Sequence, residues 1–212
     1  MDISELKRRL LPLNHQDSFD KNDQIEQQQL KDYLQATGIK PMTSFRQAAV
    51  LIPIVQNIQT SQWDVILTKR AKHLKNHPGE ISFPGGRFEP QDGHLQFTAI
   101  RETQEEIGIK QQHVELIGRL PRQNTISQYQ VTPFVGIIKP QYSITIDRNE
   151  VDEAFLVPLE FAINSSNQQI RERELNNNSF SFYVIQYNDY HIWGATAKML
   201  VNFRKILSQS EL

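Results

Sequence analysis

The segment from Gly79 to Ile109 constrains this chain more than any other, because it places a pair of glycines before a helical run of acidic residues. Glu102, Glu105 and Glu106 are spaced i, i+3 and i+4, and on an α-helix those positions lie on one face. Each near pair of like charges costs about 0.2–0.5 kcal/mol. A bound cation relieves that repulsion, and ligands that are all oxygens favour Mg²⁺ or Mn²⁺. The spacing therefore predicts a divalent metal site.

The glycine pair Gly85-Gly86 follows the short run from Ile81 to Pro84 and supplies a second part of the predicted site. Glycine has no Cβ, so the backbone here is able to approach a neighbouring group closely. An isolated cluster of glutamates is more often a solvated helix face, and the glycine pair argues against that alternative. A strand, a glycine turn and an acidic helix together predict a metal-assisted site for a diphosphate.

At these residues the chain resembles the Nudix hydrolases, whose sequence box opens with a glycine and ends in R-E-U-x-E-E-x-G-U, where U is a bulky apolar residue. The matching positions are Gly86, Arg101, Glu102, Glu105, Glu106, Gly108 and Ile109. Three features depart from the box. Asp92 replaces its first glutamate, Thr103 replaces the first U, and the spacer before Arg101 is one residue longer.

The longer spacer is a feature of one branch of this family, the coenzyme A (CoA) diphosphatases, which carry a second signature just upstream. The chain matches that signature at Ile66–Ala71, Lys75, Gly79 and Phe83–Gly86. Lys75 stands where the signature has arginine, and Ile66 where it has leucine. The resemblance is specific over residues 66–109 and looser out to Phe203. The stretch Ile192–Ala197 also resembles this branch, and we expect Trp193 within it to belong to the core.

The resemblance implies an α/β fold, the Nudix α/β/α sandwich with a mixed sheet. Residues 41–212 would form this domain, and residues 1–40 an N-terminal helical segment packed on it. The continuous apolar run Ala48–Val55 predicts a buried strand, and the alternation over Trp63–Thr68 predicts a second strand antiparallel to it. The remaining predicted elements are strands at 114–120, 131–138, 171–175, 179–187 and 190–193, and helices at 3–11, 24–36, 157–163 and from 194 onward.

The residues that would carry the chemistry follow from the resemblance. Glu102 and Glu106 would hold the cation, with Glu105 and the Gly86 carbonyl as further ligands. One carboxylate must accept a proton from the attacking water; Glu105 is the first candidate and Glu150 the second.

Two further residues, Glu150 and Arg101, have structural alternatives or roles. Glu150 lies in the acidic stretch Asp147–Glu153, which reads equally well as a solvated loop that precedes a helix. Arg101 would orient a helix glutamate or pair with Asp92.

A basic stretch from Lys69 to His77 precedes the glycine pair. A charge run of this kind is usually a solvated loop. Its position beside the glycine turn raises the alternative that some of its cations bind substrate phosphates. Arg70 and Lys75 are the better candidates because they occupy signature positions, and Gly85 and Gly86 would add backbone contacts to the substrate.

Bulk composition excludes several classes of protein. The chain has 23 basic and 24 acidic residues, a balance that gives no net attraction to nucleic acid or to an anionic membrane. It has no cysteine, which excludes disulfides, thiolate metal sites and cysteine nucleophiles. The apolar run at 48–55 is too short to span a bilayer, and the N-terminus lacks the pattern of a signal peptide. We therefore expect a soluble cytoplasmic protein without a nucleic-acid or membrane partner.

The function implied by the resemblance is metal-dependent hydrolysis of CoA or acyl-CoA at the diphosphate, giving 3′,5′-ADP and 4′-phosphopantetheine or its acyl form. One alternative is a Nudix hydrolase for ADP-ribose, a dinucleotide or another nucleoside diphosphate derivative, since Lys75 lacks the planar bidentate grip of arginine. The other is a module that binds a nucleotide without cutting it. Nudix enzymes are often dimers, so a homodimer is also among the expectations.

Overall fold

The computed structural model describes residues 3–10, 21–40 and 42–208, and of residues 21–26 it describes the backbone alone. Its centre is an eight-stranded mixed sheet in which β3, β2, β1, β7 and β5 are successive neighbours, while β4 pairs with β1, β6 with β7 and β8 with β2. These strands are β1 (Arg46–Gln56), β2 (Trp63–Arg70), β3 (Ile81–Ser82), β4 (Gly85–Arg87), β5 (Val114–Arg119), β6 (Gln123–Asn124), β7 (Tyr129–Ile138) and β8 (Val151–Pro158).

Strand β1 is buried on both faces, which explains why its sequence is an uninterrupted apolar run. Side chains of a strand alternate between the two faces of a sheet. One set, Ala48, Ile52 and Ile54, belongs to one core cluster, while Ala49 and Leu51 belong to a second cluster on the other face. β1 runs parallel to β7 and antiparallel to β2, so the predicted antiparallel partner is confirmed and the sheet is mixed.

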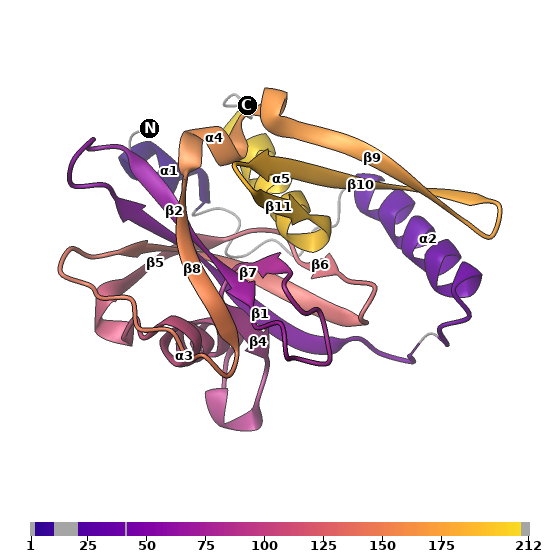
Figure 1. The fold of residues 1–212 in the computed structure, drawn as a ribbon, viewed down its shortest axis with the longest axis horizontal. Coiled ribbons are helices and arrows are strands. Elements are labelled where there is room, and N and C mark those ends of the chain that lie inside the picture. Colours follow the sequence, from indigo (N-terminus) through magenta and orange to yellow (C-terminus); the bar gives the residue numbers. More distant parts are fainter. Residues whose placement is uncertain (1–2, 11–20, 41, 209–212) are drawn as a thin grey trace.

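Helices cover both faces of this sheet (Figure 1). Helix α3 (Leu95–Ile107) packs on one face against β1 and β4. On the other face lie α1 (Ile3–Leu10), α4 (Leu159–Ile163) and α5 (Gly194–Ser208), whose apolar residues share the larger core cluster. Three layers result, and the predicted α/β/α sandwich is confirmed.

A second, antiparallel sheet of three strands extends from the α5 side of the molecule (Figure 1). It consists of β9 (Gln168–Leu175), β10 (Asn178–Tyr187) and β11 (Tyr190–Trp193). A tight turn joins β9 to β10, in which Asn176 and Asn177 both adopt positive φ, as a hairpin of this kind requires. Helix α2 (Lys21–Ala36) lies beside β10, with the Tyr33 ring edge-on to Phe180 at 5.0 Å.

The N-terminal helix α1 is joined to the core by two fully buried leucines, Leu6 and Leu10. Its charged side faces β5, where the ammonium of Lys7 lies 2.6 Å from a carboxylate oxygen of Glu115. Gly118 on β5 allows Leu10 of α1 to pack closely on this strand, since a Cβ added at position 118 would lie 2.6 Å from the Cβ of Leu10. The division of the chain at residue 40 stays a prediction.

The structure corrects the expectation for the region after residue 147. The predicted acidic loop contains the first residues of β8, which begins at Val151, and the predicted helix at 157–163 begins only at Leu159. β8 pairs antiparallel with β2 over its whole length. Its inward residues are Val151, Phe155 and Val157. Asp152 and Glu153 lie between Val151 and Phe155, so the sequence does not show an apolar alternation here.

Two smaller expectations are also wrong. Gly85 and Gly86 belong to a strand, β4, that pairs with β1 rather than to a turn. Trp193 is exposed rather than buried, with its ring edge against Phe182 at 6.1 Å. Within the described residues, no helix is long and apolar enough to cross a membrane.

The close approach of α1 to β5 generates a stability prediction. Gly118→Ala should lower the free energy of unfolding by about 1–3 kcal/mol, because the added methyl group overlaps Leu10 and forces α1 outward. The melting temperature should fall by roughly 2–4 °C per kcal/mol. Circular dichroism melting measures this change, with Ser181→Ala on the exposed side of β10 as the control. An unchanged melting temperature for Gly118→Ala would show that α1 is not held at this position.

Candidate active site

The glycine strand β4 lies directly over the acidic helix. Gly86 pairs with Ala49 of β1, and a Cβ added at Gly86 would lie 2.4 Å from the carboxyl group of Glu102. A Cβ added at Gly85 would lie 2.5 Å from the carbonyl oxygen of Ala49. Any larger residue at either position would displace the helix carboxylate or the central strand. The glycine pair thus allows the backbone of β4 to approach Glu102 and β1 closely, as predicted.

Helix α3 begins after the short turn that Asp92 closes, and His94 is the residue that precedes it. Gly108 ends the helix in the left-handed conformation that glycine adopts readily. Phe97 is exposed. The buried face consists of Thr98, Ala99, Ile100, Thr103, Glu106 and Ile107.

Arg101 binds three carboxylates at once. Its guanidinium donates to Asp92 at 2.8 and 3.1 Å, to Glu102 at 2.9 Å and to Glu105 at 2.8 Å. The Asp92 carboxylate also accepts from the Thr98 hydroxyl at 2.8 Å. The Arg101 hydrogen bond holds the pKa of Asp92 well below its usual range. Both expectations for Arg101 therefore describe the structure, because it pairs with Asp92 and also orients helix glutamates.

Glu106 is buried inside the site rather than presented to solvent, with 3% of its surface exposed. Burial raises the pKa of its carboxyl group to about 8, and the charges of Glu102 and Glu150 add to the effect. The backbone N–H of Gly85 donates to this carboxyl group. Its Oε2 atom is buried and has no hydrogen-bond partner among the described residues. Such an atom requires a bound group to satisfy it.

Glu150 and Arg70 reach the same cluster from the opposite side. Both lie where β2 ends beside the start of β8, with Arg70 paired to Val151 across a bulge. Burial raises the pKa of Glu102 against the opposing effect of Arg101, and the charges of Glu105 and Glu150 raise it further. The charge of Glu150 also raises the pKa of Glu106, whereas that of Arg70 lowers it. The buried Nε atom of Arg70 has no hydrogen-bond partner among the described residues. The fold therefore brings Glu102, Glu106, Glu150 and Arg70 together.

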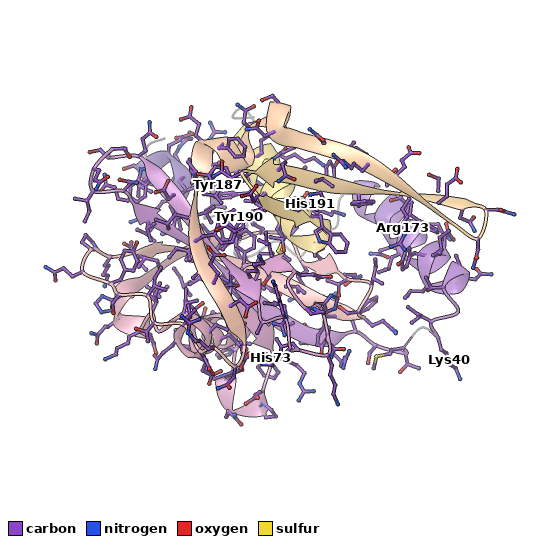
Figure 2. The ribbon with its side chains drawn as sticks, viewed as in Figure 1. Lys40, His73, Arg173, Tyr187, Tyr190 and His191 are labelled. Carbon is purple, nitrogen blue, oxygen red and sulfur yellow. The ribbon has the colours of Figure 1, made fainter. Side chains whose placement is uncertain are left out.

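The basic loop between β2 and β3 is fastened to the turn that carries Glu150. The ring N–H of His73 donates to the carbonyl oxygen of Asn149 at 3.1 Å, and the Lys72 amide donates to Asp152 at 3.3 Å. Figure 2 places His73 at the end of β8 near α3, far from His191 on the second sheet. Lys75 is exposed on this loop. Its side chain lies in solvent, whereas Arg70 is partly buried beside the carboxylate cluster.

Glu105 lies at the edge of the cluster. Just over half of its side chain is exposed, and it borders a shallow hollow on the outer side of α3 that also contacts Phe97 and Gln111. The same hollow does not include Glu106 or Arg70. Glu105 therefore borders an exposed surface of α3, whereas Glu106 is buried, although Glu105 and Glu102 share the Arg101 guanidinium.

The residues present fit a divalent cation. The donor set is carboxylate and carbonyl oxygen, which suits Mg²⁺ or Mn²⁺. The Glu102 carboxylate lies against Gly86, and the buried Oε2 of Glu106, one turn further along α3, has no partner among the described residues. In the described part of the chain, no three acidic or histidine side chains already form a complete ligand group. The Glu102 and Glu105 carboxylates are instead paired with Arg101.

Comparison with known proteins defines the class of molecule. The sequence matches the family model of the NUDIX domain over residues 45–177. It is 40% identical over 155 residues to NudL of Salmonella paratyphi B, an uncharacterized Nudix hydrolase, and the match covers 73% of this chain and 79% of that one.

Solved structures of the same family are more distant. An Ap4A hydrolase from C. elegans in a binary complex has a TM-score of 0.46 and 19% identity, covering 55% of this chain and 83% of that one. A NUDIX hydrolase from Alicyclobacillus acidocaldarius has a TM-score of 0.46 and 21% identity, covering 57% and 82%.

The fold and the carboxylate site are those of a hydrolase that acts on acid anhydrides of phosphate. More specifically, the chain belongs to the Nudix hydrolase family.

The burial of Glu106 generates a prediction for the metal-free protein. Between its ordinary pKa of 4.5 and the folded value of about 8, the unfolded chain releases a proton that the folded protein retains, so stability falls as the pH rises. Glu106→Gln removes this titration. In EDTA, its melting temperature should exceed that of the wild type at pH 8, and the difference should shrink towards pH 5.

Differential scanning calorimetry across this pH range measures the effect. Glu174→Gln on the exposed strand β9 is the matched control, because that carboxyl group lies in solvent. A difference between Glu106→Gln and wild type that does not change with pH would contradict the burial of a neutral carboxyl group.

Proposed function

We propose that this Nudix hydrolase cleaves the diphosphate of CoA or acyl-CoA to 3′,5′-ADP and 4′-phosphopantetheine or its acyl form. The observation that carries the proposal is the cluster of the buried Glu106 with the partly buried Glu102, Glu150 and Arg70 beside the glycine strand. Its acids suit a metal ion and its arginine suits a phosphate. The choice of CoA rests on the one-residue-longer spacer and on the upstream signature, whose residues flank this same cluster.

Glu102 and Glu106 are the proposed holders of Mg²⁺ or Mn²⁺, with Glu105 and the Gly86 carbonyl as further ligands. When bound, the cation neutralises charge on the bridging phosphates and makes a water molecule more acidic. The protein prepares this site by burying Glu106 and by aligning Glu102 under Gly86. Arg101 is a positioning residue, since it fixes both Glu102 and the turn at Asp92.

Arg70 is the proposed ligand of a substrate phosphate. It reaches the cluster from the end of β2, and its buried Nε–H donor lacks a partner within the described residues. A guanidinium offers two parallel donors to phosphate oxygens. Lys75, exposed on the loop that follows β2, adds a positive charge.

Glu150 is the better-placed proton acceptor of the two candidates. Arg101 holds Glu105 in an ion pair at 2.8 Å, and Glu105 faces the outer surface of α3. The charge of Glu150 acts on the pKa of both Glu102 and the buried Glu106, whereas the charge of Glu105 contributes to the raised pKa of Glu102 only. The connection of its turn to the basic loop, through the Ala71 amide and the Glu150 carbonyl at 2.9 Å, fixes its position.

A second candidate keeps the same chemistry with a different substrate, namely ADP-ribose, a dinucleotide or another nucleoside diphosphate derivative. The observation that favours it is Lys75, which replaces the arginine of the CoA signature and lies in the exposed loop.

Product analysis tests the substrate. Purified protein incubated with CoA and Mg²⁺ or Mn²⁺ should yield 3′,5′-ADP and 4′-phosphopantetheine, and EDTA should abolish both products. Chromatography separates and identifies them. Turnover of ADP-ribose or a dinucleotide with no turnover of CoA would select the second candidate.

The proton acceptor is tested by a matched pair of variants. Glu150→Gln should lower kcat by about 10²–10⁴-fold with little change in KM, the usual contribution of a positioned base, and should remove the acidic limb of the pH–rate profile. Glu105→Gln should have a smaller effect on kcat. Steady-state kinetics from pH 5 to 10 measures both. If Glu105→Gln removes the acidic limb while Glu150→Gln retains it, the two roles are reversed.

A further inference from the structure

Two arginines, Arg46 and Arg87, lie on neighbouring strands of the central sheet, on the face opposite α3. Arg87 is the last residue of β4 and pairs with Ala48 of β1, a member of the core cluster on that face. The pairing continues one residue further, since the Phe88 amide donates to the Gln47 carbonyl oxygen at 3.0 Å. Arg46 stands two positions before Ala48 and therefore points to the same face. The two arginines are thus diagonal neighbours, with about 7–8 Å between their backbone positions.

The positive charges of this pair have no carboxylate partner among the described residues. Arg87 is exposed, and its guanidinium makes no hydrogen bond or ion pair within that part of the chain. The exposed Arg46 guanidinium lies over the Tyr129 ring at 4.1 Å and donates to the Ser127 carbonyl oxygen at 3.1 Å. Neither of these partners carries a negative charge. Glu89, the acid nearest to Arg87 in the sequence, accepts a hydrogen bond from a side chain of its own turn instead.

This arrangement suits a phosphate monoester. A guanidinium has five N–H donors in a planar fork that matches the oxygens of a phosphate group. The Tyr129 ring and the Ser127 carbonyl oxygen hold the Arg46 guanidinium in one place, and its remaining donors are free to bind an anion. Like charges on neighbouring strands repel each other, and a bound phosphate relieves this repulsion. Arg46 and Arg87 therefore form an anion site.

The anion site adjoins the carboxylate cluster around the end of β4. Gly86 lies against Glu102 on the α3 face, while Arg87 points to the opposite face. Their α carbons are about 3.8 Å apart, because the two residues are consecutive. Within the described residues, β4 pairs with β1 alone, so its other edge is unpaired. A ligand with its diphosphate at the acids reaches Arg87 by crossing this edge, which lies beside α3 in Figure 1.

We propose that Arg46 and Arg87 bind the 3′-phosphate of CoA, and that they select a nucleotide that carries this group over one that lacks it. This inference rests on the proposed function. The 3′-phosphate is a monoester on the ribose that is joined to the diphosphate, so it lies near the cleaved bond without taking part in the reaction. ADP-ribose has no such group. The pair therefore distinguishes the two candidate substrates.

A comparison of CoA with dephospho-CoA, which lacks the 3′-phosphate, tests the anion site. The wild-type kcat/KM for CoA should exceed that for dephospho-CoA by roughly 10- to 100-fold, the worth of a hydrogen bond to a charged group. Arg87→Gln and Arg46→Gln should each lower this ratio about tenfold or more. Arg173→Gln on the exposed strand β9 is the matched control and should retain the wild-type ratio; Figure 2 places Arg173 near α2, far from His73.

A wild-type ratio near one would overturn the proposal, as would a normal ratio in both Arg46→Gln and Arg87→Gln. The melting temperature of Arg87→Gln should equal that of the wild type, because the exposed guanidinium has no partner within the described chain. A lower melting temperature with an equal loss of activity on both substrates would mean that Arg87 serves the fold.

Binding of 3′,5′-ADP, which has no diphosphate bond to cleave, separates this inference from the proposed function. In isothermal titration calorimetry with Mg²⁺, the wild type should bind 3′,5′-ADP at least tenfold more tightly than 5′-AMP, and Arg87→Gln should bind the two equally. This preference without any CoA turnover would leave the anion site in place and remove the proposed reaction. CoA turnover with equal binding of the two nucleotides to the wild type would remove the anion site alone.

Discussion

The active site depends on one unfavourable arrangement, the burial of the Glu106 carboxyl group among other acids. Glu106 projects from the buried face of α3 towards β4, and its neighbours Glu102 and Glu150 carry like charges. Without a cation, the folded protein avoids the cost by keeping the carboxyl group protonated. In the proposed metal-bound state, the same group would be a ligand of the cation. In the metal-free protein, its burial makes stability depend on pH.

The rest of the sandwich holds these acids in place. β1 is buried on both faces, so it fixes α3 on one side and α5 on the other. β4 adds two glycines to its edge, and their missing side chains allow Glu102 to approach the backbone. Arg101 then joins α3 to the turn before it through Asp92. The aspartate–arginine pair gives a structural role to Asp92, which stands where the family box has glutamate.

Much of the site was predictable because it depends on local spacing. The three glutamates, the glycine pair and Gly108 lie within one short segment, and helical periodicity places the acids on neighbouring turns. The layers of the fold also followed from the sequence, since a continuous apolar run indicates a strand covered on both faces. The errors arose where pairing partners decide the outcome. β8 was missed because its pairing with β2, and not its own composition, makes it a strand.

The sequence by itself determined the family, the acidic helix, the glycine pair and the basic loop, because each is encoded in contiguous residues. Only the tertiary structure decided which charges meet. Arg70 and Glu150 are 80 positions apart in the chain, and the pairing of β2 with β8 brings both to the cluster. The tertiary structure also decided solvent exposure: Glu106 is buried, whereas Glu105, its neighbour in sequence, is more than half exposed. Helical periodicity gives only the direction of a side chain, whereas its solvation depends on what packs against it.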